Sequence, residues 1–245
     1  MKAIILAAGE GVRMRPLTLE RPKPLVEVLG KPILTHIFEA LPEAITELIV
    51  VIGYRGEQIQ EYYGSHYNGK PVTYVAQSER GTLGALRSCR DILPEDEKFL
   101  VMNGDDLHGP DGIRACVEGD AYALMVAQVP HPEKFGVVEV DEAGRIVSIE
   151  EKPELPKTNL VSTGLWVLDA SVFRYPVEPQ KNGEYYLTDP TMAMISEGRD
   201  IYAIKTSAWF PIGYPEDIAR AEDVLRRSLR IKNEAAIRSH IQAWS

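Results

Sequence analysis

The most constraining feature of this 245-residue sequence is a short apolar run that ends in a glycine-rich, cationic segment. Residues 3 to 8 are all apolar, which is typical of one buried parallel strand, and Gly9 and Gly11 follow at once. Because glycine has no Cβ, the backbone there can lie against a ligand with its N–H groups pointing inward, a geometry that suits phosphate oxygens. The segment therefore predicts a strand that ends in an anion-binding loop.

Four cations follow this loop closely, and prolines keep the segment that carries them extended. The cations are Arg13, Arg15, Arg21 and Lys23, and the prolines are Pro16, Pro22 and Pro24. Two common phosphate-binding loops do not match, because a P-loop requires Ser or Thr after Gly-Lys and a dinucleotide fingerprint requires a third glycine where Met14 stands. The sequence therefore predicts a phosphate site of another kind.

Composition narrows the class of protein. With 44% hydrophobic residues, the chain can bury a full core, and we expect one domain over residues 1–245. The net charge of −9 argues against a general nucleic-acid binder, and no stretch has the length and apolarity of a membrane span or the form of a signal peptide. Cys89 and Cys116 lack metal-ligand spacing, which predicts buried thiols. We expect a cytoplasmic protein without a nucleic-acid or membrane partner.

Apolar strand-like runs alternate with helical patterns over the first half of the chain. We expect strands at 48–52, 72–76, 99–102 and 121–129, and helices at 33–41, 57–63, 82–93 and 112–117. Such alternation is typical of an α/β fold with a doubly wound, mostly parallel sheet. Ligands bind beyond the carboxyl ends of the strands in that architecture, where Gly9, Gly53, Gln77 and Gly104 fall.

The second half of the chain has a different pattern. Residues 135–153 alternate around a turn at 142–144 and predict a β-hairpin, and further strands are expected at 160–168 and 201–206. From Pro215 the spacing is helical, with one apolar and one basic face, so this helix is a candidate surface for homo-oligomer formation. The two faces consist of Ile218, Ala221, Leu225 and Leu229, and of Arg226, Arg227 and Arg230.

The opening motifs together resemble those of the sugar-1-phosphate nucleotidylyltransferases. LAAGEGVRMRPLT, PKPLVEV and GKPIL match the family pattern L-A-[AG]-G-x-G-T-R-[LM]-x-P-L-T, then P-K-x-L, then G-K-P, with Val12 in place of the usual Thr. The resemblance covers most of the chain and implies a Rossmann-like, GT-A-like fold without a left-handed β-helix domain. It also implies a nucleotide-binding part at about 1–130, and a sugar-binding part with the hairpin and C-terminal helix at about 131–245.

The resemblance implies a reaction, its partners and a cofactor. A nucleoside triphosphate, with UTP or dTTP favoured, would transfer its nucleotidyl group to a hexose 1-phosphate with the help of Mg²⁺. Arg13 and Lys23 would neutralise the departing pyrophosphate, and Asp105, at the end of a predicted strand, would hold the metal ion. From the sequence, we expect the neighbouring Asp106 to face solvent or to cap the next helix.

The nucleotide contacts implied by the resemblance come from three segments. They are Leu6, Ala7, Ala8, Gly9, Gly11, Gln77, Gly81, Thr82, Asn103 and Gly104. The Gln77 amide offers a donor and an acceptor, which matches the imide edge of uracil or thymine. The alternative is that Gln77 is a surface amide and that Thr82 caps a helix.

The sugar-phosphate contacts implied by the resemblance lie in the hairpin and the strand after it. They are Gly136, Glu151, Lys152, Thr163, Gly164 and Trp166. Glu150 competes with Glu151, because strand alternation lets only one of the two carboxylates face inward. Trp166 is either the floor of the sugar pocket or an ordinary core residue.

One departure from the family lies near the C-terminus. Relatives commonly read W-x-D-I-G-x-P-E-D, whereas this chain reads WFPIGYPED and has Pro211 in place of a metal-binding aspartate. Glu216 and Asp217 follow at a helix start, where carboxylates usually act as cap partners. The histidines show no ligand or triad spacing, so we interpret them as structural.

Two other functions remain as alternatives at this stage. The segment PLTLERPKPLVEV also resembles that of mannose-1-phosphate guanylyltransferases. A catalytically silent regulatory subunit on the same fold is the alternative of another class, although such subunits characteristically lose the loop cations that this chain keeps. The sequence does not distinguish glucose, N-acetylglucosamine and N-acetylmuramate phosphates.

Overall fold

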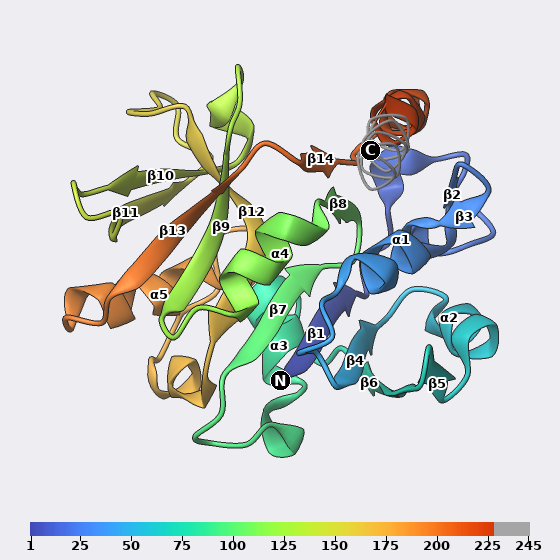
Figure 1. The fold of residues 1–245 in the computed structure, drawn as a ribbon, viewed down its shortest axis with the longest axis horizontal. Coiled ribbons are helices and arrows are strands. Elements are labelled where there is room, and N and C mark those ends of the chain that lie inside the picture. Colours follow the sequence, from blue (N-terminus) through green and yellow to red (C-terminus); the bar gives the residue numbers. More distant parts are fainter. Residues whose placement is uncertain (228–245) are drawn as a thin grey trace, which may run out of the picture.

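A mixed β-sheet runs through the middle of the computed structural model, which describes residues 1–227 (Figure 1). Its central strands are parallel and lie in the order β7–β1–β4–β6. They are β1 Lys2–Ala7, β4 Glu47–Ile52, β6 Lys70–Ala76 and β7 Phe99–Asn103. The predicted strands at these positions are confirmed. The apolar runs of β1, β4 and β7 suit strands that are buried on both faces, whereas only Val72 of β6 is buried.

Helices cover both faces of this sheet, as expected for a doubly wound fold. Helices α1 (Ile33–Ala40), α2 (Gly56–Tyr63) and α4 (Pro110–Val117) pack into the core on one face. Helices α3 (Thr82–Arg87) and α5 (Thr188–Ser196) pack into the core on the other. The predicted doubly wound architecture is confirmed.

One helix is shorter than the sequence predicts. The expected helix at 82–93 ends at Arg87, and a 3₁₀ helix follows at Arg90–Ile92. The Ser88 hydroxyl donates to the Gly84 carbonyl at 3.2 Å and accepts from the Ser78 N–H at 2.9 Å. These local hydrogen bonds compete with continuation of the helix.

The second half of the chain adds strands around β12 (Leu160–Leu168), which runs antiparallel to β7. The predicted hairpin is confirmed as β10 (Gly136–Val140) and β11 (Ile146–Glu151). Strands β9 (Tyr122–Gln128) and β13 (Ile201–Thr206) extend the sheet on the other side of β12. Along one edge β12 pairs first with β10 and then with β7. Between these two regions its register against β9 shifts around Gly164, whose φ is +75°.

A small ribbon at the carboxyl ends of the central strands joins distant parts of the chain. Strand β8 (Asp106–His108) pairs antiparallel with β14 (Trp209–Pro211), and a helix follows over residues 216–227. Other short strands are β2 Glu27–Val28, β3 Lys31–Pro32 and β5 His66–Tyr67. The predicted helix positions Leu229 and Arg230 lie outside the described residues.

The structure also bears on the cysteines and on membrane-spanning helices. Cys89 and Cys116 are free and buried, as predicted, and burial raises the pKa of each thiol to about 12. In the part of the chain that the structure describes, no helix combines the length and apolarity needed to cross a bilayer.

Candidate active site

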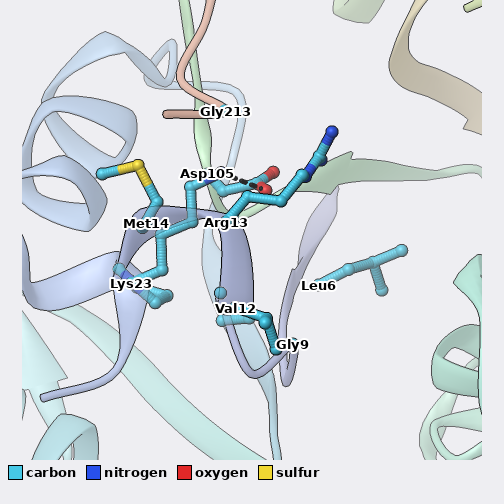
Figure 2. Close-up of a pocket in the computed structure, with 12 residues that line it drawn as sticks. Leu6, Gly9, Val12, Arg13, Met14, Lys23, Asp105 and Gly213 are labelled. Carbon is cyan, nitrogen blue, oxygen red and sulfur yellow. Dashed lines mark hydrogen bonds and ion pairs between the residues drawn. The ribbon is translucent and has the colours of Figure 1, made fainter. Parts of the chain in front are cut away.

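A cavity of about 200 Å³ opens beside the glycine-rich loop (Figure 2). Its walls come from the carboxyl ends of β1 and β7, from the segment after β1, and from Gly213 after β14. Many predicted functional residues line it, namely Leu6, Ala7, Gly9, Gly11, Arg13, Lys23, Gly104 and Asp105; Val12, Met14 and Pro24 lie among them. The structure therefore brings the glycine-rich loop together with Gly104 and Asp105 at one edge of the sheet.

Gly11 shapes the loop because its backbone is left-handed and closely packed. Its φ is +61°, and a Cβ there would lie 3.1 Å from both the Lys23 Cβ and the Thr18 Cγ2. The Thr18 hydroxyl donates to the Gly11 carbonyl at 2.8 Å, and the buried Met14 donates its N–H to the same carbonyl at 2.9 Å. A side chain at position 11 would displace Lys23, so the glycine fixes where this cation stands.

Lys23 and Asp105 meet in the cavity as an ion pair (Figure 2). The Lys23 Nζ lies 2.7 Å from the Asp105 Oδ2, and Lys23 is only 6% exposed. A buried ammonium requires a compensating charge, whereas the Asp105 side chain remains 39% exposed. Asp105 thus neutralises Lys23 and still has accessible carboxylate surface for a further cation.

Arg13 belongs to a short 3₁₀ helix, Val12–Met14, at the mouth of the cavity. Its guanidinium carbon lies 5.4 Å from the centre of the Tyr214 ring. Sequence reasoning did not single out Tyr214 or the cavity-lining Gly213. Both residues reach the cavity region because β14 pairs with β8, and no local sequence pattern specifies that pairing.

The expectation that Asp106 faces solvent or caps a helix is wrong. Asp106 is buried with 8% exposure, because β14 pairs with β8 and covers it. Burial raises the pKa of Asp106 to about 7; the nearby Asp105 carboxylate adds to this shift and Lys23 opposes it. Pro211 is the residue directly opposite Asp106 in this ribbon.

His108, on the same strand as Asp106, agrees with the structural interpretation of the histidines. Its Nε2 lies 3.2 Å from the Thr163 carbonyl oxygen, and burial lowers its pKa to about 4. The imidazole is therefore neutral at pH 7 and helps to join β8 to β12.

Gln77, Gly81 and Thr82 lie on a separate loop before α3. The Gln77 amide donates to the carbonyls of Glu79 at 2.6 Å and Gly81 at 3.3 Å, so its nitrogen holds this loop together. The predicted alternative that Thr82 caps α3 is wrong, because its hydroxyl instead accepts from the Leu187 N–H at 3.0 Å. Contact between Gln77 and a base stays a prediction.

Residues 185–187 close against this loop, a role that the sequence did not reveal. A Cβ on Gly81 would lie 2.3 Å from the Tyr185 carbonyl oxygen. The Leu83 N–H donates to that oxygen, and the Tyr185 N–H donates to the Arg80 carbonyl, each at 2.9 Å. Position 81 therefore requires glycine, because the backbone of Tyr185 leaves no room for a side chain there.

The structure distinguishes Glu150 from Glu151. A Cβ on Gly136 would lie 3.1 Å from the Glu151 Oε2 and 3.7 Å from the Ser162 Cβ, so Glu151 lies over Gly136 beside the strand of the predicted sugar site. Strand alternation turns Glu150 to the opposite face. Lys152 lies 3.4 Å from Glu151 through Nζ, and its Nζ is 5.9 Å from the centre of the Tyr186 ring.

Two predicted sugar-site side chains are buried in the protein interior. Trp166 is 3% exposed within the core that α3 and α5 cover, so the interpretation as a core residue holds and the pocket-floor interpretation is wrong. Thr163 is 1% exposed, and its hydroxyl donates to the Met125 carbonyl at 3.1 Å. Gly164 instead packs against Asn103, whose Nδ2 would lie 2.2 Å from a Cβ.

The donor set at the cavity suits a magnesium ion that substrate phosphates help to bind. Over residues 1–227, no cluster of three or more His, Cys, Asp or Glu side chains is placed to hold a metal ion. Asp105 nevertheless offers an accessible carboxylate, and Mg²⁺ usually combines one or two carboxylates with water and phosphate oxygens. Asp217 is unsuited as a ligand, because its Oδ2 accepts from the N–H groups of Gly213 and Tyr214, each at 2.9 Å.

Comparison with known proteins places this geometry in context. The family model described as nucleotidyl transferase matches residues 2–228. UTP–glucose-1-phosphate uridylyltransferase AglF of Haloferax volcanii is 40% identical over 237 residues, which cover 92% of this chain and 97% of that protein. The bifunctional protein GlmU of Methanocaldococcus jannaschii is 37% identical over 230 residues, which cover 92% of this chain and 54% of that protein. The structure of a putative glucose-1-phosphate thymidylyltransferase from Bacillus anthracis has a TM-score of 0.83 at 29% identity, covering 92% of this chain and 95% of that one.

Proposed function

The chain belongs to the nucleotidyl transferase family, and on that premise we propose that it transfers a nucleotidyl group from UTP or dTTP to a hexose 1-phosphate. The observation that carries this proposal is the single cavity that combines the glycine loop, Arg13, Lys23 and Asp105. The products are a nucleotide sugar and pyrophosphate.

The reaction is an in-line attack by a phosphate oxygen of the sugar 1-phosphate on the α-phosphorus. No general base is required, because a phosphate monoester with a second pKa of about 6 is already mostly dianionic at neutral pH. The protein therefore positions two anions and neutralises the charge that develops on the leaving group. Lys23 and Arg13 act on the pyrophosphate side, and Lys152 holds the sugar phosphate.

The metal site in this proposal rests on Asp105. A bound Mg²⁺ supplies charge neutralisation on the triphosphate oxygens. Lys23, which forms an ion pair with Asp105, would gain a second anionic partner when the triphosphate binds. Its ammonium is already desolvated by burial, which strengthens its attraction to phosphate.

One activity panel tests the proposal. UTP, dTTP, GTP and ATP are combined with the 1-phosphates of glucose, N-acetylglucosamine and mannose, and pyrophosphate release is measured. We expect turnover with UTP or dTTP and a gluco-configured sugar. A preference for GTP with mannose 1-phosphate would establish the guanylyltransferase alternative, and turnover with none of the pairs would favour the silent regulatory subunit.

Base choice gives a first prediction. Gln77→Ala should weaken kcat/KM for UTP or dTTP by about 1 to 3 kcal/mol, because a site that pairs with the imide edge loses its partner. GTP and ATP, already poor substrates, should change much less. Since the amide also ties Glu79 and Gly81, an equal loss with every triphosphate would show that Gln77 acts only on the loop.

The hairpin gives a second prediction with a matched control. Glu151→Ala should raise the KM for the sugar 1-phosphate by about tenfold or more, since a charged hydrogen-bond acceptor contributes about 1.5 to 3 kcal/mol. Glu150→Ala, one residue away on the opposite face, should leave this KM within about twofold. Steady-state kinetics at saturating triphosphate measure both values, and equal effects would contradict the placement of Glu151.

A further inference from the structure

The ring of Tyr214 underlies the guanidinium of Arg13 at the mouth of the cavity. The Arg13 Cζ lies 5.4 Å from the ring centre, within the range of a cation–π contact. Within residues 1–227, Arg13 forms no ion pair or side-chain hydrogen bond, so this ring is its defined side-chain partner there. The contact joins the first loop of the chain to the segment after β14.

The backbone that carries Tyr214 is held from both sides. The N–H groups of Gly213 and Tyr214 donate to the Asp217 Oδ2 at 2.9 Å each, and the Asp217 N–H donates to the Tyr214 carbonyl at 3.0 Å. Ile212, just before them, is 1% exposed and belongs to the core. The backbone position of Tyr214 is thus fixed, although the residue is 48% exposed.

Stacking leaves the chemistry of the arginine available. Within residues 1–227 no carboxylate or carbonyl accepts from the Arg13 side chain, and a π face leaves its charge uncancelled, so its N–H donors remain available for phosphate oxygens. A carboxylate partner would instead occupy those donors and cancel the charge. A free arginine side chain also loses much rotamer freedom when it binds an anion, and a ring that restricts it beforehand lowers that cost.

We propose that Tyr214 is a positioning residue that pre-orients Arg13 for the pyrophosphate portion of the triphosphate. The inference rests on the proposed function only in assigning Arg13 to that anion; it is independent of which base or sugar the enzyme uses. The ring acts, and the hydroxyl does not, because the contact is with the face of the ring. Tyr214→Phe should therefore preserve the effect, whereas Tyr214→Leu should remove it.

The test measures binding of inorganic pyrophosphate with Mg²⁺ by calorimetry on the full chain. Tyr214→Leu should raise the dissociation constant about three- to fivefold, the size expected for an exposed cation–π contact. Tyr214→Phe should remain within about 1.5-fold of the unaltered protein. Tyr62→Leu is the control, since Tyr62 is a tyrosine of α2 that is 60% exposed and lies outside the cavity lining.

A double-mutant cycle separates positioning from a general structural role. In an Arg13→Ala background, Tyr214→Leu should weaken pyrophosphate binding no further, because the residue that it positions is gone. With turnover, kcat should fall in Tyr214→Leu while the KM for the sugar 1-phosphate stays unchanged. Thermal unfolding should show that all variants remain folded.

Several results would overturn the inference. They are equal losses in the Phe and Leu variants, an additive loss in the Arg13→Ala background, and no pyrophosphate binding by the unaltered protein. Failure of the proposed function would look different. The unaltered protein would then bind pyrophosphate but release none from any pair of substrates, and the binding cycle would still test Tyr214.

Discussion

Lys23→Ala is expected to lower kcat by about a hundredfold or more while the KM for the sugar 1-phosphate changes little. Lys23 is buried beside the cavity and lies 2.7 Å from Asp105, so its ammonium acts where water screens it poorly. Negative charge grows on the pyrophosphate oxygens as the bond to the α-phosphorus breaks. Removing the cation therefore costs more in the transition state than in the bound substrate.

Lys31→Ala is the matched control for this prediction. Lys31 belongs to β3 and is half exposed, and its Nζ lies 2.8 Å from the Glu39 Oε2. It does not line the cavity. An exposed pair of this kind contributes little, so kcat should stay near that of the unaltered enzyme. Initial rates of pyrophosphate release, measured over a range of concentrations of both substrates, give kcat and KM for each variant.

The result must also be separated from damage to the fold. Lys23→Ala leaves Asp105 without its partner, whereas Lys23→Ala combined with Asp105→Asn removes both charges. If thermal unfolding shows the single variant to be folded and kcat is near normal, the proposed role of Lys23 is wrong. Arg13→Ala should show a similar loss of kcat, since Arg13 lies at the same cavity.

Much of the fold follows from local sequence. Strands β1, β4 and β7 are recognisable because both of their faces are buried, so their buried residues form apolar runs. The predicted hairpin over β10 and β11 follows from its alternation around a turn, and the predicted loop at Gly9 and Gly11 follows from glycine chemistry. These features depend on residues within a few positions of one another.

The errors at the site share a different cause. Asp106 is buried because β14 pairs with β8, although the two strands lie far apart in the chain. Trp166 faces the core because of the side of the sheet on which α3 and α5 pack. The Thr82 hydroxyl accepts from Leu187, in a segment that no motif connected to it. Local patterns do not specify which distant segment covers a given side chain, so these placements required the structure.

The other large effect expected concerns Asp105 and the metal. Asp105→Asn should nearly abolish turnover, because the amide keeps the shape but loses the charge that attracts Mg²⁺. With Pro211 in place of the family's aspartate, we propose that Asp105 is the sole side-chain ligand and that triphosphate oxygens and water fill the other positions. The ion should then bind poorly without nucleotide, and Mn²⁺ titration followed by electron paramagnetic resonance, with and without UTP, measures this directly.

Restoring the family residue provides the complementary experiment. Pro211 lies directly opposite Asp106 in the β14–β8 ribbon, so Pro211→Asp would place a carboxylate beside the buried Asp106, the residue next to the proposed ligand Asp105. The Mg²⁺ concentration for half-maximal rate should fall, and the added repulsion should lower thermal stability unless Mg²⁺ and nucleotide are present. Pro211→Asn is the control, because it makes the same backbone change without charge and should not lower the Mg²⁺ requirement.

A structure with bound nucleotide would decide between this account and its competitor. Asp106, Glu216 or Asp217 within about 2.0 to 2.1 Å of the ion would show that a second carboxylate has replaced the missing one. Asp217 is disfavoured because its carboxylate holds the backbone of Gly213 and Tyr214, and Asp106 because it is only 8% exposed. Such a ligand would contradict the role of Asp105 as sole side-chain ligand, and so would an unchanged Mg²⁺ requirement in a folded, active Pro211→Asp enzyme.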